Sequence, residues 1–252
     1  METADKTQKT EKPEKIKVSI VAPVYNEEGS IAALHDEIVS MCGDPAGLRV
    51  PAEWELIVVD DGSDDKTPEI CSHLDPIRYI RLSSNQGQTA ALDCGFKAAS
   101  GEYIAAIDGD GQNDPADIPR MLQFLIDNDL DAVSGWRKDR HDPFSKKIAS
   151  RGAYLLRQIM LQDGIHDSGC TLKVYRKECF RDLTLTGDQH RFIPALLKQR
   201  GMHVGEIEVN HRPRMHGKSK YDHKRFYRGI RDLMHIHNAK YRSFDNRRNG
   251  GL

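Results

Sequence analysis

Residues 103–112 read YIAAIDGDGQ, and this stretch decides the fold. Apolar and aromatic residues run as far as Ile107 and then stop at two aspartates, Asp108 and Asp110, which are separated by one glycine. A short apolar run bounded by turn residues is typical of a buried strand. The stretch therefore predicts a strand over Tyr103–Ile107 with two carboxylates at its carboxyl end.

Three earlier runs have the same form, at Val18–Val24, Glu55–Val59 and Ile77–Leu82. Apolar residues with helical spacing lie between the runs, notably over Ser30–Met41 and Gln88–Ala99. Strands that alternate with helices predict an α/β fold of Rossmann-like type with a mostly parallel sheet. Further strands are expected at Asp131–Ser134, Thr171–Tyr175 and, at an edge, His203–Val209, with helices at Asp117–Asn128, up to Met160 and at His190–Gln199.

Length and composition indicate one globular domain with appendages. The chain has 252 residues, of which 38% are hydrophobic and 30% charged, and no apolar stretch approaches the ~18 residues of a membrane span. The first 17 residues hold five lysines and four acids without an apolar core. We therefore expect a disordered arm over residues 1–15 rather than a secretory signal, and a protein inside the cell.

The carboxyl-terminal part of the chain is basic although the net charge is only -1. From Arg212 onward there are 12 lysines and arginines against three acids, which predicts an anionic partner, either a phosphate ligand or a membrane surface. An apolar stripe at helical spacing, with basic residues around it, favours a helix on an anionic membrane. The stripe comprises Phe226, Ile230, Leu233 and Met234. The alternative is that this stripe packs onto the domain.

Polar clusters follow all four of the first strands, where an open α/β sheet binds ligands. The clusters begin at Tyr25, Asp60, Ser83 and Asp108. In the last of these, Asp108, Asp110 and the carbonyl of Gln112 form an oxygen-rich, incomplete ligand set that suits Mg²⁺ or Mn²⁺ together with phosphate oxygens. An isolated Asp-Gly-Asp would more simply be a turn. The three companion clusters favour the metal site.

The ordered motifs resemble those of a known family. They are VSIVAPVYNEE (18–28), VVDDGS (58–63), NQGQTAAL (85–92), DGDGQ (108–112) and DSGC (167–170). This set resembles the family 2 inverting glycosyltransferases, and among them the dolichol-phosphate mannose synthase or polyprenyl-phosphate glycosyltransferase group. The resemblance implies a GT-A fold over residues 16–215, with helices on both faces of the sheet. Many members of the group carry transmembrane helices after this domain, whereas here the basic amphipathic segment described above is expected over residues 216–252.

The resemblance also implies roles for single residues. Pro23, Tyr25 and Glu27 would line the nucleotide pocket, with Asp60 near the base. Asp108, Asp110 and Gln112 match the metal and diphosphate motif, and Arg191, Arg212 and Lys218 match positions that face the donor phosphates. Arg137 and Arg151, with Ser150 beside the second, match positions that hold the acceptor phosphate. The catalytic group would be Asp108, Asp110 and Arg191.

The nature of the acceptor decides whether a general base is needed. A phosphate monoester has a second pKa of ~6, so it is already anionic and nucleophilic at neutral pH. A hydroxyl acceptor would need a base, and Asp188 is the candidate. Asp188 could equally be the N-cap of the helix expected at His190–Gln199.

The activity implied is transfer of a hexose, mannose or glucose first, from a GDP- or UDP-sugar to a polyprenyl phosphate (dolichyl or undecaprenyl), with inversion. One alternative is a family 2 enzyme that acts on a hydroxyl of a glycan, a protein or a small molecule, and another is a catalytically silent nucleotide-sugar-binding protein. The expected location is the cytoplasmic face of a membrane, to which the protein binds peripherally, with help from a membrane-anchoring subunit. No nucleic-acid partner is expected.

Overall fold

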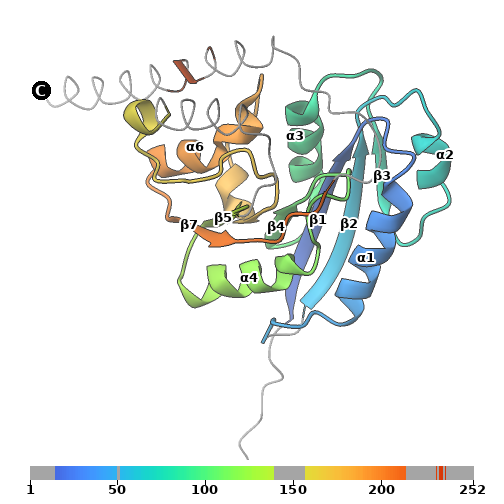
Figure 1. Cartoon of the computed structure of the whole chain (residues 1–252), viewed down its shortest axis with the longest axis horizontal. Coiled ribbons are helices and arrows are strands. Elements are labelled where there is room, and N and C mark those ends of the chain that lie inside the picture. Colours follow the sequence, from blue (N-terminus) through green and yellow to red (C-terminus); the bar gives the residue numbers. More distant parts are fainter. Residues whose placement is uncertain are drawn as a thin grey trace, which may run out of the picture.

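One seven-stranded sheet forms the centre of the computed structural model, which describes residues 15–49, 52–138 and 157–213 with Arg231, Leu233, Met234 and Ile236. The strand order is β3-β2-β1-β4-β6-β5-β7 (Figure 1). The strands are β1 (Ile16–Val24), β2 (Ala52–Asp60), β3 (Arg78–Arg81), β4 (Tyr103–Ala106), β5 (Ala132–Trp136), β6 (Lys173–Arg176) and β7 (Val204–Glu208). Only β6 runs antiparallel to its neighbours, β4 and β5. The expected mostly parallel sheet is confirmed.

Helices cover both faces of the sheet, as the sequence predicts. One face packs against α1 (Ile31–Gly43), α2 (Thr67–Cys71) and α4 (Asp117–Asp127), and the other against α3 (Gln88–Ala98) and α6 (Ile193–Gln199). Alternate residues of the strands point to the two faces, so Ile20 lies in the first apolar cluster and Val21 in the second. Both clusters are shielded from water, and they hold the strands in fixed register.

The register brings the carboxyl ends of the six parallel strands to one edge of the sheet. Val24 of β1 lies opposite Asp60 of β2, and Asp60 lies opposite Arg81 of β3. Because β6 runs the other way, its first residue rather than its last reaches this edge, where Lys173 lies opposite Ala106 of β4. This edge of the sheet is called the rim below. It receives side chains from the beginning of β6 as well as from the ends of the parallel strands.

The structure differs from the expectation in its short elements. The five-residue helix α2 is too short to show a periodic pattern. The single helix expected over His190–Gln199 is divided into the 3-10 helix η2 (Gln189–Phe192) and α6, which has Pro194 in its first turn. Proline is favoured at that position because its missing N–H would have no partner there. A second 3-10 helix, η1 (Lys177–Phe180), follows β6.

Two residues of the carboxyl-terminal segment pack onto the domain. Leu233 and Ile236 are buried in an apolar cluster with Leu161, Phe192 and Ala195. The neighbouring Met234 is 51% exposed. The alternative in which the apolar stripe covers the domain therefore holds for Leu233 but not for Met234. The other two members of the stripe, Phe226 and Ile230, lie outside the described residues. Among the described parts of the chain, no helix combines the length and apolar character needed to cross a bilayer.

Candidate active site

The loops that follow β1 and β2 are joined by hydrogen bonds. The Asn26 N–H donates to Ser63 Oγ (2.9 Å), and the Asn26 side chain exchanges two hydrogen bonds with Asp64. Asn26 has φ 53°, a left-handed conformation that asparagine tolerates better than most residues. These bonds fix the backbone on either side of Asn26, so Tyr25 and Glu27 stand partly buried at the rim, directly after Pro23 and Val24 of β1.

Asp60 is enclosed beneath these loops. Its side chain has 0% exposure, one oxygen accepts the Ser63 N–H (2.8 Å) and the other accepts the Tyr79 hydroxyl (2.7 Å). Burial and this hydrogen bond raise the pKa of Tyr79. Asp61 likewise accepts the N–H groups of Gln86 and Gly87. Both aspartates therefore shape the rim, and the contact of Asp60 with a nucleotide base stays a prediction.

The structure places Asp108 and Asp110 together at the centre of the rim. A Cβ at Gly109 would lie 2.6 Å from Cγ1 of Val24, so only glycine allows the loop to pass this close to β1. The Gly109 carbonyl accepts a hydrogen bond from Ser30 Oγ (2.9 Å), and Asp108 accepts one from Gln88 Nε2 (2.6 Å). Ser30, the N-cap residue of α1, and Gln88, the first residue of α3, thus hold the carboxylate loop from either side.

The electrostatics of this loop suit a divalent cation. Burial and the charge of Asp110 raise the pKa of Asp108 to about 6, against the lowering effects of a Thr171 hydrogen bond and of the Arg137 and Lys173 charges. A cation between the carboxylates would remove their repulsion. No group of three or more His, Cys, Asp or Glu side chains with metal-site geometry occurs in the described ranges. A two-carboxylate site fits Mg²⁺ or Mn²⁺ that retains water and phosphate oxygens as its other ligands.

Asp108→Asn should raise the melting temperature of the metal-free protein by about 3–6 °C at pH 7.5. Asparagine keeps an acceptor for Gln88 but removes the charge beside Asp110. The pKa of about 6 exceeds the ordinary value of 3.8, so native Asp108 takes up its proton first as the pH falls. The gain in melting temperature from Asp108→Asn should therefore be complete above about pH 7 and fade between about pH 6 and 4. Calorimetry with a chelator over this range measures it.

Asp129→Asn is the control for this measurement, because the Asp129 side chain is 98% exposed. It should change the melting temperature by no more than about 1 °C at any of these pH values. A less stable Asp108→Asn protein at pH 7.5 would show that neighbouring cations already balance the charge of Asp108.

Thr171, just before β6, and Lys173, its first residue, lie beside Asp108 and were not predicted from the sequence as site residues. Lys173 is fully buried, its Nζ donates to the Cys170 carbonyl, and burial lowers its pKa. The only signal in the sequence is a lysine inside the apolar run TLKVY (171–175). Lys173 reaches the rim because β6 runs antiparallel to β4. A lysine inside an apolar run does not reveal that direction.

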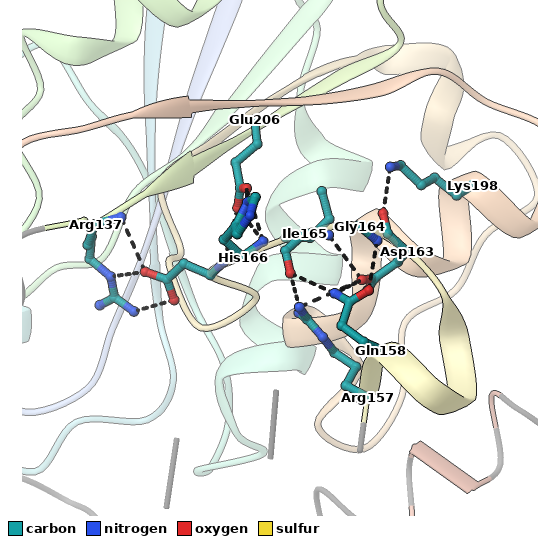
Figure 2. Close-up of polar contacts among 10 residues, drawn as sticks. Arg137, Arg157, Gln158, Asp163, Gly164, Ile165, His166, Lys198 and Glu206 are labelled. Atoms are coloured by element: carbon teal, nitrogen blue, oxygen red, sulfur yellow. Dashed lines mark hydrogen bonds and ion pairs between the residues drawn. The ribbon is translucent and has the colours of Figure 1, made fainter. Parts of the chain in front are cut away.

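Arg137 follows the end of β5 and forms a two-point ion pair with Asp167 (Figure 2). Its Nε lies 2.7 Å from one oxygen of Asp167 and its Nη2 lies 3.0 Å from the other. Burial acts to lower the pKa of Arg137, but the hydrogen bonds and charge of Asp167 raise it. Within the described ranges, the Nη1 atom has no hydrogen-bond partner. The charge of Arg137 acts on Asp108, so this guanidinium belongs to the same site.

Arg212 lies on a segment that pairs with the carboxylate loop. Its N–H donates to the Gln112 carbonyl (2.9 Å), and Gln112 Nε2 approaches the Arg212 carbonyl (3.4 Å). The guanidinium is paired with Glu37 (2.7 Å) and Asp114 (2.9 Å). Arg212 therefore lies beside the carboxylate loop, and its charge is engaged by acids of the protein. The predicted contacts of Arg212 with phosphate and of Gln112 with a metal remain predictions.

Arg191 comes from η2, on the α3 side of the site. The adjacent His190 is buried, and its Nδ1 lies 2.7 Å from Thr89 Oγ1 in the first turn of α3. The helix α3 thus connects the Arg191 segment to Asp108, to which Gln88 donates. Asp188 immediately precedes η2 but makes no side-chain cap hydrogen bond. Asp188 therefore takes the N-cap position, here of η2, although its side chain does not cap the helix.

Three predicted residues lie outside the described part of the chain, namely Ser150, Arg151 and Lys218. Their expected roles stay predictions. Of the others, the structure brings Asp108, Asp110, Gln112 and Arg137 to one rim with the β1 loop, and places Arg191 and Arg212 at opposite sides of it.

Curated relatives share most of this chain. It is 40% identical over 229 residues to dodecaprenyl-phosphate galacturonate synthase of Rhizobium johnstonii, covering 88% of this chain and 66% of the relative. It is 35% identical over 223 residues to undecaprenyl-phosphate 4-deoxy-4-formamido-L-arabinose transferase of Yersinia pestis, covering 86% and 66%. The chain therefore spans about two thirds of the length of these relatives.

Solved structures and a family model agree with the architecture. Glucosyl-3-phosphoglycerate synthase from Mycobacterium tuberculosis, solved with Mn²⁺, UDP-glucose and phosphoglyceric acid, superposes with a TM-score of 0.67 at 16% identity over 89% of this chain and 79% of that one. This similarity confirms a fold of GT-A type. The family model described as "Glycosyl transferase family 2" matches residues 19–184. The chain belongs to glycosyl transferase family 2.

Proposed function

We propose that this protein transfers a sugar from a nucleoside-diphosphate sugar to a polyprenyl phosphate, with inversion at the sugar carbon. The observation that carries the proposal is the pairing of opposite charges at one rim. Asp108 and Asp110 form an anionic side for a divalent cation, while Arg137 and Lys173 form a cationic side for phosphate. The relatives named for dodecaprenyl and undecaprenyl phosphate support the lipid class of the acceptor.

The donor half would comprise the loops after β1, β2 and β4. Tyr25 and Glu27 stand partly buried on the turn that Asn26 fixes, where they would contact the nucleoside. Asp108 and Asp110, with Gln112, would hold Mg²⁺ or Mn²⁺, which supplies Lewis-acid stabilisation of the departing diphosphate when it is bound. Negative charge grows on that diphosphate as the glycosidic bond breaks, so cations preorganised there lower the barrier.

The remaining arginines would hold the donor phosphates from two sides. Arg191 lies on η2, which the hydrogen bond between Thr89 and His190 ties to α3. Arg212 would first have to leave Glu37 and Asp114, and Lys218 would act from the segment beyond it. Guanidinium forks suit phosphate oxygens better than the ammonium of lysine does.

The acceptor half would be centred on Arg137, with Ser150 and Arg151 completing the phosphate contacts. A polyprenyl phosphate arrives already ionised, so its oxygen can attack the sugar carbon without a base. The protein then needs only to place that oxygen on the face opposite the leaving diphosphate, which positioning groups achieve. Asp188 would take no part in proton transfer in this reaction.

The sugar is proposed as a hexose or a derivative of one. Mannose and glucose were expected from the sequence, and the Rhizobium relative is named for galacturonate. We propose a GDP- or UDP-linked donor, and the labelled donors named below distinguish the two bases.

We place the protein at the cytoplasmic face of the membrane that contains its lipid. The basic segment after Arg212 supports peripheral binding to anionic lipid. Leu233 and Ile236 dock this segment onto the domain, beside Phe192 of η2, which would bring the membrane surface close to the site. A membrane-anchoring subunit would strengthen the attachment.

The test is incubation of the protein with Mn²⁺ or Mg²⁺, undecaprenyl or dolichyl phosphate, and one labelled donor at a time, followed by organic extraction. The donors are GDP-mannose, UDP-glucose, UDP-N-acetylglucosamine and UDP-galacturonate. Label in the organic phase that depends on both metal and lipid is the expected result. Label confined to a water-soluble glycan or small molecule would instead indicate a hydroxyl acceptor, and no transfer from any donor that binds would indicate a silent nucleotide-sugar-binding protein.

A further inference from the structure

We propose that Glu206, on the edge strand β7, is a positioning residue that aims the guanidinium of Arg137 at the acceptor phosphate. It acts through the two loop residues His166 and Asp167 and touches no substrate itself. The inference rests on the proposed function, because it takes Arg137 as the residue that binds the acceptor.

The Glu206 carboxylate is used entirely to hold the loop. Its side chain is 9% exposed, and it accepts the backbone N–H of His166 at both oxygens (3.0 Å each) and that of Asp167 at Oε1 (3.0 Å). The His166 ring adds a third donor, with Nδ1 2.7 Å from Oε2 (Figure 2). A nearly buried carboxylate with so many charge-assisted bonds fixes the backbone at 166–167 against β7.

Asp167 transmits this position to Arg137. Its two oxygens bind Nε and Nη2 of the guanidinium, which sets the plane and the direction of the group as well as its distance. Both side chains are largely buried, so water cannot substitute for either partner. The guanidinium can therefore point toward Asp108 only as accurately as Glu206 places the backbone of Asp167.

An aromatic stack connects Glu206 to Arg137 by a second route. The ring of Trp136, the residue before Arg137, lies on the His166 ring at 4.5 Å with an interplanar angle of 18°. The hydrogen bond from His166 Nδ1 to Glu206 orients the imidazole for this contact. Glu206 thus supports the last residue of β5 as well as the partner of Arg137.

The preceding part of the loop is held independently, so loss of Glu206 should not release the whole loop. Asp163 accepts from the Ile165 N–H (3.1 Å) and from Gln158 Nε2 (3.0 Å), and its carbonyl accepts from Lys198 Nζ (2.6 Å). Figure 2 shows these contacts on the side of the loop away from Arg137. A Glu206 variant should consequently fold, with a disturbance limited to His166, Asp167 and Arg137.

Fluorescence tests the structural step without any substrate. The chain has two tryptophans, so in a Trp54→Phe background all tryptophan emission comes from Trp136. His166→Ala in that background defines the unstacked signal. Glu206→Gln places an amide N–H against the N–H groups of His166 and Asp167, which also need an acceptor. It should reproduce at least half of the change in Trp136 emission that His166→Ala causes. Glu178→Gln is the control, since Glu178 is an exposed glutamate of η1, beyond the end of β6 that lies opposite the rim, and it should leave the emission unchanged.

Steady-state kinetics test the functional step. Glu206→Gln should raise KM for undecaprenyl phosphate about tenfold and leave KM for the sugar nucleotide within about twofold, because only the acceptor group is misplaced. In an Arg137→Gln background the same change should add less than about twofold, since the two residues act in series. Glu178→Gln should leave both KM values unchanged. A residue that merely stabilised the fold would not alter one KM alone.

Each contrary result has its own meaning. If Arg137→Gln does not change KM for the lipid, the acceptor role of Arg137 fails and this inference fails with it. If Arg137→Gln raises that KM while Glu206→Gln does not, the positioning role alone is overturned. Unchanged Trp136 emission in Glu206→Gln, or effects of Glu206→Gln and Arg137→Gln that multiply, would also overturn it.

Discussion

Asp110→Ala should slow sugar transfer by about 10³-fold or more while the protein stays folded. Asp110 is one of two carboxylates that we propose hold the divalent cation, and the other cannot retain it alone in a site that relies on water and phosphate for its remaining ligands. Loss of the cation removes the charge that stabilises the departing diphosphate, which is worth several kcal/mol. Initial rates with Mn²⁺ and a saturating lipid acceptor measure the effect, and Mn²⁺ titration should show the lost binding.

Glu53→Ala is the control for Asp110→Ala. Glu53 is an exposed acid near the amino end of β2, at the opposite edge of the sheet, and pairs only loosely with Lys15 (3.6 Å). Its removal should leave the rate within about twofold of the parent. A near-normal rate for Asp110→Ala at low Mn²⁺ would eliminate the metal site and, with it, the donor half of the proposed function.

Arg137→Gln should raise KM for the polyprenyl phosphate by about 10- to 100-fold, with a much smaller effect on KM for the sugar nucleotide. A charge-assisted hydrogen bond to phosphate contributes about 1.5–3 kcal/mol, and every 1.4 kcal/mol corresponds to a factor of ten. The substitution also removes the guanidinium that balances the buried charge of Asp167, which destabilises the protein. The melting temperature should therefore fall together with lipid affinity.

A paired substitution separates these two effects. Arg137→Gln combined with Asp167→Asn removes both charges, so it should restore most of the stability but none of the lipid affinity. Arg176→Gln is the matched arginine control, because Arg176 pairs with the exposed Asp129 far along β6. Recovery of a normal lipid KM in the paired variant would show that Arg137 has a structural task only.

Much of the fold follows from local patterns in the sequence. The apolar runs and the turn residues that end them locate β1, β2 and β4 to within a few residues, because a strand buried on both faces has little freedom in composition. The edge strand β7 is also visible as an alternating pattern. The antiparallel direction of β6 is not, since a strand has the same hydrophobic pattern in either direction.

The residues of the site likewise include some that the local sequence pattern predicts and others that it does not. Asp108 and Asp110 are predictable because they interrupt an apolar run, and Gly109 marks the close approach to β1. Lys173 is not predictable as a neighbour of Asp108, because that proximity depends on the direction of β6. Glu206 is equally hidden, since its partners His166 and Asp167 are about 40 positions away in the sequence.

Arginines illustrate a further limit of sequence patterns. Arg137 and Arg212 are located by the motif resemblance, but the resemblance does not disclose their carboxylate partners. Asp167 reinforces Arg137 in place, whereas Glu37 and Asp114 hold Arg212 to acids of the protein. Whether a carboxylate fixes an arginine within the site or engages its charge depends on side chains that are distant in the sequence and meet only in the folded chain.

The reversed strand β6 has a consequence for how such an enzyme can diversify. It separates a parallel group of strands, β1 to β4, whose loops we propose bind the nucleotide, from a second parallel pair, β5 and β7, which positions Arg137. Substitutions in one group of strands need not disturb the strand register of the other group, because β6 lies between them. Hybrid chains that exchange residues 131–209 between relatives should therefore inherit lipid preference from one parent and nucleotide preference from the other.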